Sequence, residues 1–349
     1  MPFTLRTLLI AALLLVGAIG GLLAFSSGRG GENNLVVYTS VDAEFALPLF
    51  EQFTKETGIN VVPRTDGESS KTTAMAERLL QMKERPDGDV FWNSELSQTL
   101  LLAKNGVFQP YAAENARSIP AEFKDTANLW TGFGCRARVL VYNTNKLRRE
   151  ELPQSLEELA DPKWKGRFLV AKPLFGTTRS HLVSFAIVLG EEKAFELFRA
   201  WRANGVVIAE SNGDVRNRVA QGTFDLGLTD TDDVFSAMDR KKPVDYVVPD
   251  QTRDWRGAYL IPNTVSMLKN CSNPAAAKKF IDYLLKPETE AWLAKQGARQ
   301  IPVRDVGVEM PEALKNLKPA NPGAESLAEK VLPLGEKIYR ILLGEENHR

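Results

Sequence analysis

Apolar and polar residues follow two different periods along the chain between residues 34 and 106. Short apolar runs of strand length alternate with stretches whose apolar residues recur every three or four positions. The runs are NLVVYTS (34–40), INVVPRT (59–65) and DVFWN (89–93), and the helical stretches are ALPLFEQFTKETG (46–58), KTTAMAERLLQMKE (71–84) and LSQTLLLAKNG (96–106). Two of the helical stretches end at a glycine, Gly58 and Gly106, as helices commonly do. Strict alternation of strand and helix predicts an α/β fold in which a mostly parallel sheet carries helices on both faces.

The alternation continues beyond residue 131. Strands are predicted at 137–143, 206–211, 224–228, 243–250 and 258–270. Helices are predicted at 177–190, 191–205, 212–222 and 273–297, and the stretch 155–173 pairs a helix with a strand. Pro287 should break the helix in which it lies. Residues from 301 onward are expected to form helices packed on the outside.

Small polar residues gather where the predicted strands end and the helices begin. They are Thr39 and Ser40, residues 69–73, Asn93 and Ser94, residues 176–178, residues 211–214, and residues 229–233. In doubly wound α/β folds the ligand binds beyond the carboxyl ends of the strands. We therefore expect these loops to meet at one crevice, with Thr39, Ser40, Asn93, Thr177 and Thr178 as ligand donors.

The densest of these loops is TDTDD (229–233), which follows the apolar FDLGL. Asp and Thr often cap helices, and a cap is worth about 1 kcal/mol. Capping explains one or two of these residues but not all five. We expect Asp230, Thr231 and Asp232 to contact the ligand, with a carboxylate that binds an ammonium group, several hydroxyls or a metal.

A second loop, GESSKTT (67–73), combines hydroxyls with a lysine at a predicted helix start. Ser70, Lys71 and Thr72 could hold a phosphate, phosphonate or carboxylate, since helix N-termini attract anions. A helix cap with a solvated lysine is an equally good explanation. The loop lacks the GxxxxGK[ST] spacing, so nucleotide hydrolysis is not supported.

Two arginines alternate in GCRAR and share one face of the predicted strand. Arg136 is expected to pair with surface acids, and Arg138 to reach an anion across the crevice. Asn263 lies in the turn-like IPNT and is either a ligand contact or part of a plain turn promoted by Pro262. His181 is expected to be structural, because no nucleophile–base or metal-binding motif accompanies it.

Composition narrows the classes of function. The 349 residues suffice for two domains, and the chain carries 44 basic and 44 acidic residues. The absence of a basic field makes nucleic acid a poor partner. The two cysteines, Cys135 and Cys271, fit neither a zinc motif nor a disulfide framework, although one bridge between them or two free thiols are both open. No cofactor is expected.

The N-terminus carries an uncharged apolar run from Leu8 to Phe25, followed by SSGRGGENN. This pattern predicts an export signal over residues 1–26, or an uncleaved membrane anchor of the same length. In both cases the remainder should work in the periplasm or elsewhere outside the cytoplasmic membrane.

Several stretches resemble the extracellular solute-binding proteins of ABC importers, in the branch usually called ferric-iron-binding. They include YTSVDAEFALPLFEQFTKETGI, DVFWNSE, GFGCRARVLVYNT, LADPKWKG and IPNTVSMLKN, in the family's order, and the similarity extends over residues 34–304. The resemblance implies a two-lobed type II periplasmic-binding fold, hinge closure on a ligand and docking to a membrane permease. We assign residues 34–130 and 258–349 to lobe 1 and residues 131–257 to lobe 2.

The iron site of that branch does not carry over residue by residue. Ferric-binding relatives use an adjacent tyrosine pair after the strand that FDLGL resembles, and here TDTDD takes its place. A His or Tyr often follows the first strand of relatives, whereas this chain has Asp42 and Glu44. Fe³⁺ is a hard cation, so Asp230, Asp232 and Asp233 could supply oxygen ligands in a different site.

The sequence therefore predicts an exported, monomeric binding protein that captures a small polar anion or zwitterion, such as a phosphorylated or phosphonate compound, without altering it. Ferric iron is the alternative cargo. A metal-dependent periplasmic hydrolase that uses the aspartates is the alternative from another class, and the absence of a nucleophile–base pair argues against it.

Overall fold

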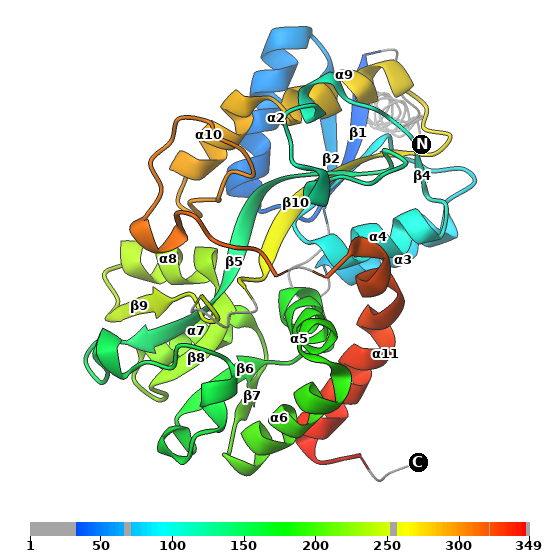
Figure 1. Ribbon diagram of the computed structural model, residues 1–349. Coiled ribbons are helices and arrows are strands. Elements are labelled where there is room, and N and C mark those ends of the chain that lie inside the picture. Colours follow the sequence, from blue (N-terminus) through cyan, green and yellow to red (C-terminus); the bar gives the residue numbers. More distant parts are fainter. Residues whose placement is uncertain (1–32, 66–70, 252–256, 321, 347–349) are drawn as a thin grey trace, which may run out of the picture.

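The computed structural model describes residues 33–65, 71–251, 257–320 and 322–346, without the side chains of Lys71 and Thr72. Its strands are β1 (Asn34–Thr39), β2 (Asn60–Arg64), β3 (Val90–Asn93), β4 (Phe108–Gln109), β5 (Thr131–Asn143), β6 (Phe168–Ala171), β7 (Val207–Ala209), β8 (Leu226–Asp230), β9 (Val244–Val247) and β10 (Leu260–Leu268). Its α-helices are α2 (Ala43–Thr57), α3 (Lys71–Gln81), α4 (Leu96–Lys104), α5 (Gly176–Leu189), α6 (Glu191–Ala203), α7 (Asn212–Ala220), α8 (Thr231–Asp239), α9 (Pro274–Leu284), α10 (Pro287–Lys295) and α11 (Ala324–Leu343) (Figure 1).

The strands form two parallel cores that are joined by antiparallel strands. In one half, β2, β1 and β3 run parallel. In the other half, β7, β6 and β8 run parallel. Strands β10 and β5 lie between the halves in the order β3-β10-β5-β8 and pair antiparallel with their neighbours. This arrangement confirms the predicted two-lobed α/β class, and it places the parallel strands within each half.

Strand β5 is the main connection between the two halves. Its residues Thr131 to Ala137 pair with β10, and its residues Arg138 to Tyr142 pair with β8. In Figure 1 this strand runs from the upper half of the molecule to the lower half. Side chains near the middle of β5 are therefore held between the halves.

The strand bends where the halves meet. Gly134 has a φ of +48°, and a Cβ atom there would lie 2.8 Å from Gln300 Oε1. The partner strand β10 shifts register between Pro262 and Asn263, beside the same bend. A left-handed glycine opposite an irregular strand gives the crossover a fixed kink that a side chain at Gly134 would disturb.

The C-terminal helix α11 lies along one side of the molecule, against α5 and α6 and also against α4 (Figure 1). It buries an apolar stripe of Leu327, Val331, Ile338 and Ile341. This helix thus contacts helices on both sides of the predicted lobe boundary. The lobe boundaries after residues 130 and 257 remain a prediction.

Most predicted elements are present within one to four residues of their expected ends, including the break at Pro287, where α9 and α10 are separate helices. Two expectations were wrong. The described residues between 301 and 323 form no α-helix and hold only the 3₁₀ turn Glu312–Leu314. Residues 155–160 likewise form no α-helix but only a short 3₁₀ turn, Glu157–Ala160. Asp161 and Pro162 stop this segment early, since Asp161 accepts a hydrogen bond from the Lys163 N–H and opens the next turn.

Both cysteines are free, and Cys135 is fully buried in β5. No helix within the described residues combines the length and hydrophobicity that a bilayer span requires. The predicted signal or anchor segment lies outside the residues that the structure describes.

Candidate functional site

A buried arginine organises the strand ends of the second half. Arg138 Nη1 donates to Asp230 Oδ1 at 2.5 Å and to Asn212 Oδ1 at 3.1 Å. The two hydroxyls at the start of α5 lie 3.3 Å from the guanidinium, Thr177 from Nη1 and Thr178 from Nη2. The Arg138 side chain is 0% exposed and that of Asp230 is 2% exposed. The guanidinium predicted to reach a ligand is instead engaged by the protein's own carboxylate.

Asp230 ends β8 and precedes α8, but its side chain makes no capping hydrogen bond. Its second oxygen, Oδ2, accepts from Thr177 Oγ1 at 2.8 Å and from Asn212 Nδ2 at 3.2 Å. Thr231 instead accepts a hydrogen bond from the Ala137 N–H at 3.2 Å, which ties the start of α8 to the crossover strand. Both residues hold the second half together.

The polar residues of the first half also bond mainly to one another. Ser40 Oγ donates to Asn93 Oδ1 at 2.7 Å and accepts from the Ser94 N–H at 2.9 Å. Asn93 Nδ2 reaches Thr99 Oγ1 at 3.2 Å. Thr39 Oγ1 accepts from the Val41 N–H at 3.1 Å. These predicted donors converge, and they stabilise the ends of β1 and β3.

Arg136 bridges the two halves. Its Nη2 donates to the Ser94 carbonyl at 2.6 Å, beyond β3. Its Nη1 lies 3.1 Å from Asp230 Oδ2 and 3.2 Å from Asp232 Oδ2 at the start of α8. The nearby carboxylates raise the pKa of Arg136 despite the cost of burial. Arg136, expected at the surface, is only 15% exposed and lies between the halves.

A cavity of about 320 Å³ opens beside this bridge. Its lining includes Asp42 and Glu44 from the region where α2 begins, Asp232 and Asp233 from the first turn of α8, and Arg216 from α7. The remaining lining residues are Phe45, Ser236, Asp239, Arg240, Gly297 and Ala298. Five carboxylates against two guanidiniums make the cavity an environment that favours cations.

The aspartates after β8 are close enough to share one ion. Carboxylate oxygens of Asp230, Asp232 and Asp233 lie within 4.8 Å of one another. Burial and the neighbouring carboxylates raise the pKa of Asp233 to about 7, although Arg216 Nη1 lies 3.3 Å from its Oδ1. Burial also raises the pKa of Asp232, whose Oδ1 is buried with no hydrogen-bond partner among the described residues. This part of the site has anionic oxygens to offer to a cation.

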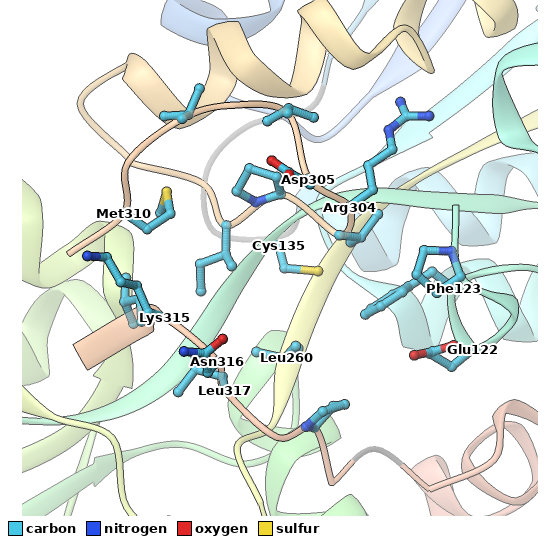
Figure 2. A pocket seen from close by; sticks show the side chains of 18 of the residues that line it. Glu122, Phe123, Cys135, Leu260, Arg304, Asp305, Met310, Lys315, Asn316 and Leu317 are labelled. Carbon is cyan, nitrogen blue, oxygen red and sulfur yellow. The ribbon is translucent and has the colours of Figure 1, made fainter. Parts of the chain in front are cut away.

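A larger cavity, of about 510 Å³, lies elsewhere, between the crossover strands β5 and β10 and the segment 301–319 (Figure 2). Its wall is largely apolar and includes Phe123, Cys135, Leu260, Met310 and Leu317. Within the described part of the chain, none of the residues predicted to bind the ligand lines this cavity. Size alone therefore does not identify the binding site.

The remaining predicted residues fall in three places. Asn263 faces the bend of the crossover, where its Nδ2 donates to the Gly134 carbonyl at 2.5 Å and to Gln300 Oε1 at 2.7 Å. Lys71 and Thr72 begin α3, and the structure does not describe their side chains. Ser70 lies outside the described residues. Of these residues the structure describes the side chain of Asn263, which does not line the cavity.

Sequence reasoning did not single out Asn212 or Arg216. Ser211 caps α7 by accepting from the Asp214 N–H at 3.1 Å, which brings Asn212 to Arg138 and leaves Arg216 beside Asp233. The polar loop SNGD marked the helix start, but nothing local indicates which side chains face the second half's aspartates. Asp42 was noticed only through its position after the first strand.

The fold and this interlobe cavity define a type II periplasmic binding protein. The chain belongs to the bacterial extracellular solute-binding protein family, whose profile matches residues 97–327. Proteins of this kind capture solutes outside the cytoplasmic membrane for ABC importers, and the chain is the solute-binding component of such a system.

Three similar proteins illustrate the range of ligands named for proteins that resemble this chain. Iron uptake protein A1 of Synechocystis is 27% identical over 274 residues, which cover 76% of this chain and 75% of that protein. Iron-bound HitA from Pseudomonas aeruginosa has a TM-score of 0.75 at 23% identity, covering 87% of this chain and 99% of HitA. AfuA from Actinobacillus pleuropneumoniae, solved with fructose-6-phosphate, has a TM-score of 0.73 at 22% identity, covering 90% of this chain and 99% of AfuA. Both solved structures share the fold of this chain.

Proposed function

We propose that this chain delivers a multivalent, oxygen-preferring cation, with Fe³⁺ as the first candidate, to a membrane permease. The observation that carries the proposal is the interlobe cavity, in which Asp42 and Glu44 from one half lie on the same lining as Asp232 and Asp233 from the other. Hard cations prefer several anionic oxygens. A cation held by both groups would draw the halves together, as hinge closure requires.

The relatives support the metal but not the ligand set. Iron uptake protein A1 and iron-bound HitA are named for iron. This chain has carboxylates where the resemblance implies phenolates. A cation would meet Asp232, whose pKa is raised by burial, and Asp233, whose pKa of about 7 means that protons compete with it near pH 7. Binding should therefore release protons and weaken as the pH falls.

A phosphorylated or zwitterionic solute is the second candidate. It is supported by Arg216 and Arg240, which line the same cavity as the acids. The AfuA structure contains a sugar phosphate in the same fold. Arg138, the guanidinium first expected to bind an anion, pairs with the buried Asp230 and contributes less to this candidate.

We also propose that the protein does not alter its cargo, and that it acts as a monomer without nucleic acid. Residues 1–26 are either cleaved on export or anchor the protein in the membrane. A hydrolase has little support in the described cleft. His181 is buried and stacks on Tyr259 at a centroid distance of 5.4 Å, and burial lowers its pKa. N-terminal sequencing of the exported protein distinguishes cleavage from anchoring.

Calorimetry on chelator-treated protein tests the cargo. Ferric nitrilotriacetate, Mn²⁺, fructose 6-phosphate and 2-aminoethylphosphonate are titrated into the wild type, D232N/D233N and the surface control E114Q. We expect the wild type and E114Q to bind the metals, and the double variant to bind them at least about tenfold more weakly because two ligand charges are lost. A ferric complex without an intense visible band would fit carboxylate ligation. Binding of a phosphorylated compound with no response to either metal would reject the cation.

A further inference from the structure

Arg136 lies at the junction of the two halves and contacts both. It lies on β5, at the point where pairing passes from β10 to β8. One guanidinium nitrogen bonds the Ser94 carbonyl of the first half, and the other lies within 3.2 Å of the Asp230 and Asp232 carboxylates of the second. The side chain of Arg138, two residues on, bonds among the described residues only to residues of the second half.

The guanidinium and a bound cation would need the same oxygen. Asp232 Oδ2 is held by Arg136, whereas its Oδ1 is buried without a described partner. Asp230 Oδ2 is also in contact with Arg136. A metal that coordinates Asp232 through both oxygens, or bridges Asp232 and Asp230, has to replace Nη1 at these atoms.

We infer that Arg136 is a specificity-determining residue, a cation tethered between the lobes that the cargo must displace from Asp232. The inference rests on the proposed cation-binding function. Binding then becomes an exchange of one positive group for another. A monovalent ion gains too little from Asp232 to replace a guanidinium that has two carboxylate contacts, so the site should admit only ions of higher charge.

The charged groups that face Arg136 are Asp230, Asp232 and Asp233 from the β8–α8 junction, while Asp42 acts on Asp232 from the start of α2. Arg138 and Arg216 each pair with one of these aspartates. Arg136 is the guanidinium in contact with Asp232, so it is the group that a bound cation would have to replace there.

The test compares R136M, R136K and the exposed control R117M with the wild type. Mn²⁺ is titrated by calorimetry at pH 8, and ferric nitrilotriacetate is titrated into the wild type at the same pH. We expect R136M to bind Mn²⁺ at least about tenfold more tightly than the wild type, because the competing charge is gone. R136K, with a single-point ammonium, should lie between, and R117M should match the wild type.

The outcomes separate the two proposals. If R136M retains the wild-type circular dichroism and binds Mn²⁺ no more tightly at pH 8, Arg136 is not a competitor, and ferric binding by the wild type would keep the proposed function intact. If neither the wild type nor R136M binds either metal, both proposals fail. If R136M does not fold, R136K decides: tighter Mn²⁺ binding than the wild type supports the exchange, and equal or weaker binding overturns it.

Discussion

Asp230 and its neighbours Asp232 and Asp233 belong to one five-residue motif but experience opposite surroundings. Asp230 ends a strand and is 2% exposed, with both oxygens bonded to Arg138, Thr177 and Asn212. Asp232 and Asp233 lie in the first turn of α8, line the cavity and have raised pKa values. The backbone change from strand to helix turns identical side chains in different directions. Asp230 is therefore bonded within the fold, whereas Asp232 and Asp233 line the cavity.

The largest expected effect comes from breaking the buried pair. R138M should lower the free energy of unfolding by about 3–5 kcal/mol, because the buried Asp230 carboxylate would lose its closest compensating charge. R216M, the matched change at the half-buried Asp233 pair, should cost only about 1 kcal/mol, since Asp233 can take up a proton. Urea unfolding at pH 7 measures both. Equal losses in the two variants would contradict the distinction between the two regions.

Replacing Asp233 should raise the free energy of unfolding instead of lowering it. Its pKa rises from the ordinary 3.8 to about 7 in the folded protein, so between these values the folded chain holds a proton that the unfolded chain has released. The stability from this proton is present below pH 4 and is lost as the pH rises through about 7. D233N avoids the loss and should be more stable than the metal-free wild type by about 1–3 kcal/mol at pH 8.

The same variant should show almost no gain at pH 4. Urea unfolding curves at pH 4, 6 and 8 follow the difference, and D245N, a change at a carboxylate far from the cavity, serves as the reference. A constant difference across these three pH values would count against a raised pKa at Asp233.

A smaller effect is expected within the network around Asp230. T177V removes the hydroxyl that donates to Asp230 Oδ2 at 2.8 Å and should cost about 1–2 kcal/mol. T178V should cost less, about 0.5–1 kcal/mol, because its hydroxyl bonds Asn212 and lies 3.3 Å from Arg138 without touching the carboxylate. Metal affinity should change little in either variant. A loss of affinity in T177V as large as that in D232N/D233N would place Thr177 in the binding site.

Local patterns in the sequence determined the order of the elements, the α/β class and the gathering of polar residues at strand ends. Apolar spacing and helix-ending glycines such as Gly58 depend only on neighbours along the chain, so they can be found without coordinates. The resemblance in DVFWNSE, GFGCRARVLVYNT and IPNTVSMLKN pointed to the solute-binding family, which the family match confirms.

Only the tertiary structure decided which charges are free to bind. Arg136 and Arg138 alternate on one face of the strand, yet Arg138 pairs with the buried Asp230 while Arg136 bridges the halves. Asn263, expected at the cleft or in a turn, instead bonds the bend at Gly134 and Gln300.

The partners that make these differences are distant along the chain. Ser94 lies 42 positions from Arg136, Asp230 lies 92 positions from Arg138, and Gly134 lies 129 positions from Asn263. They meet only because both halves pack on β5. Periodicity carries no information about such partners, because it reports only which face of an element a side chain occupies.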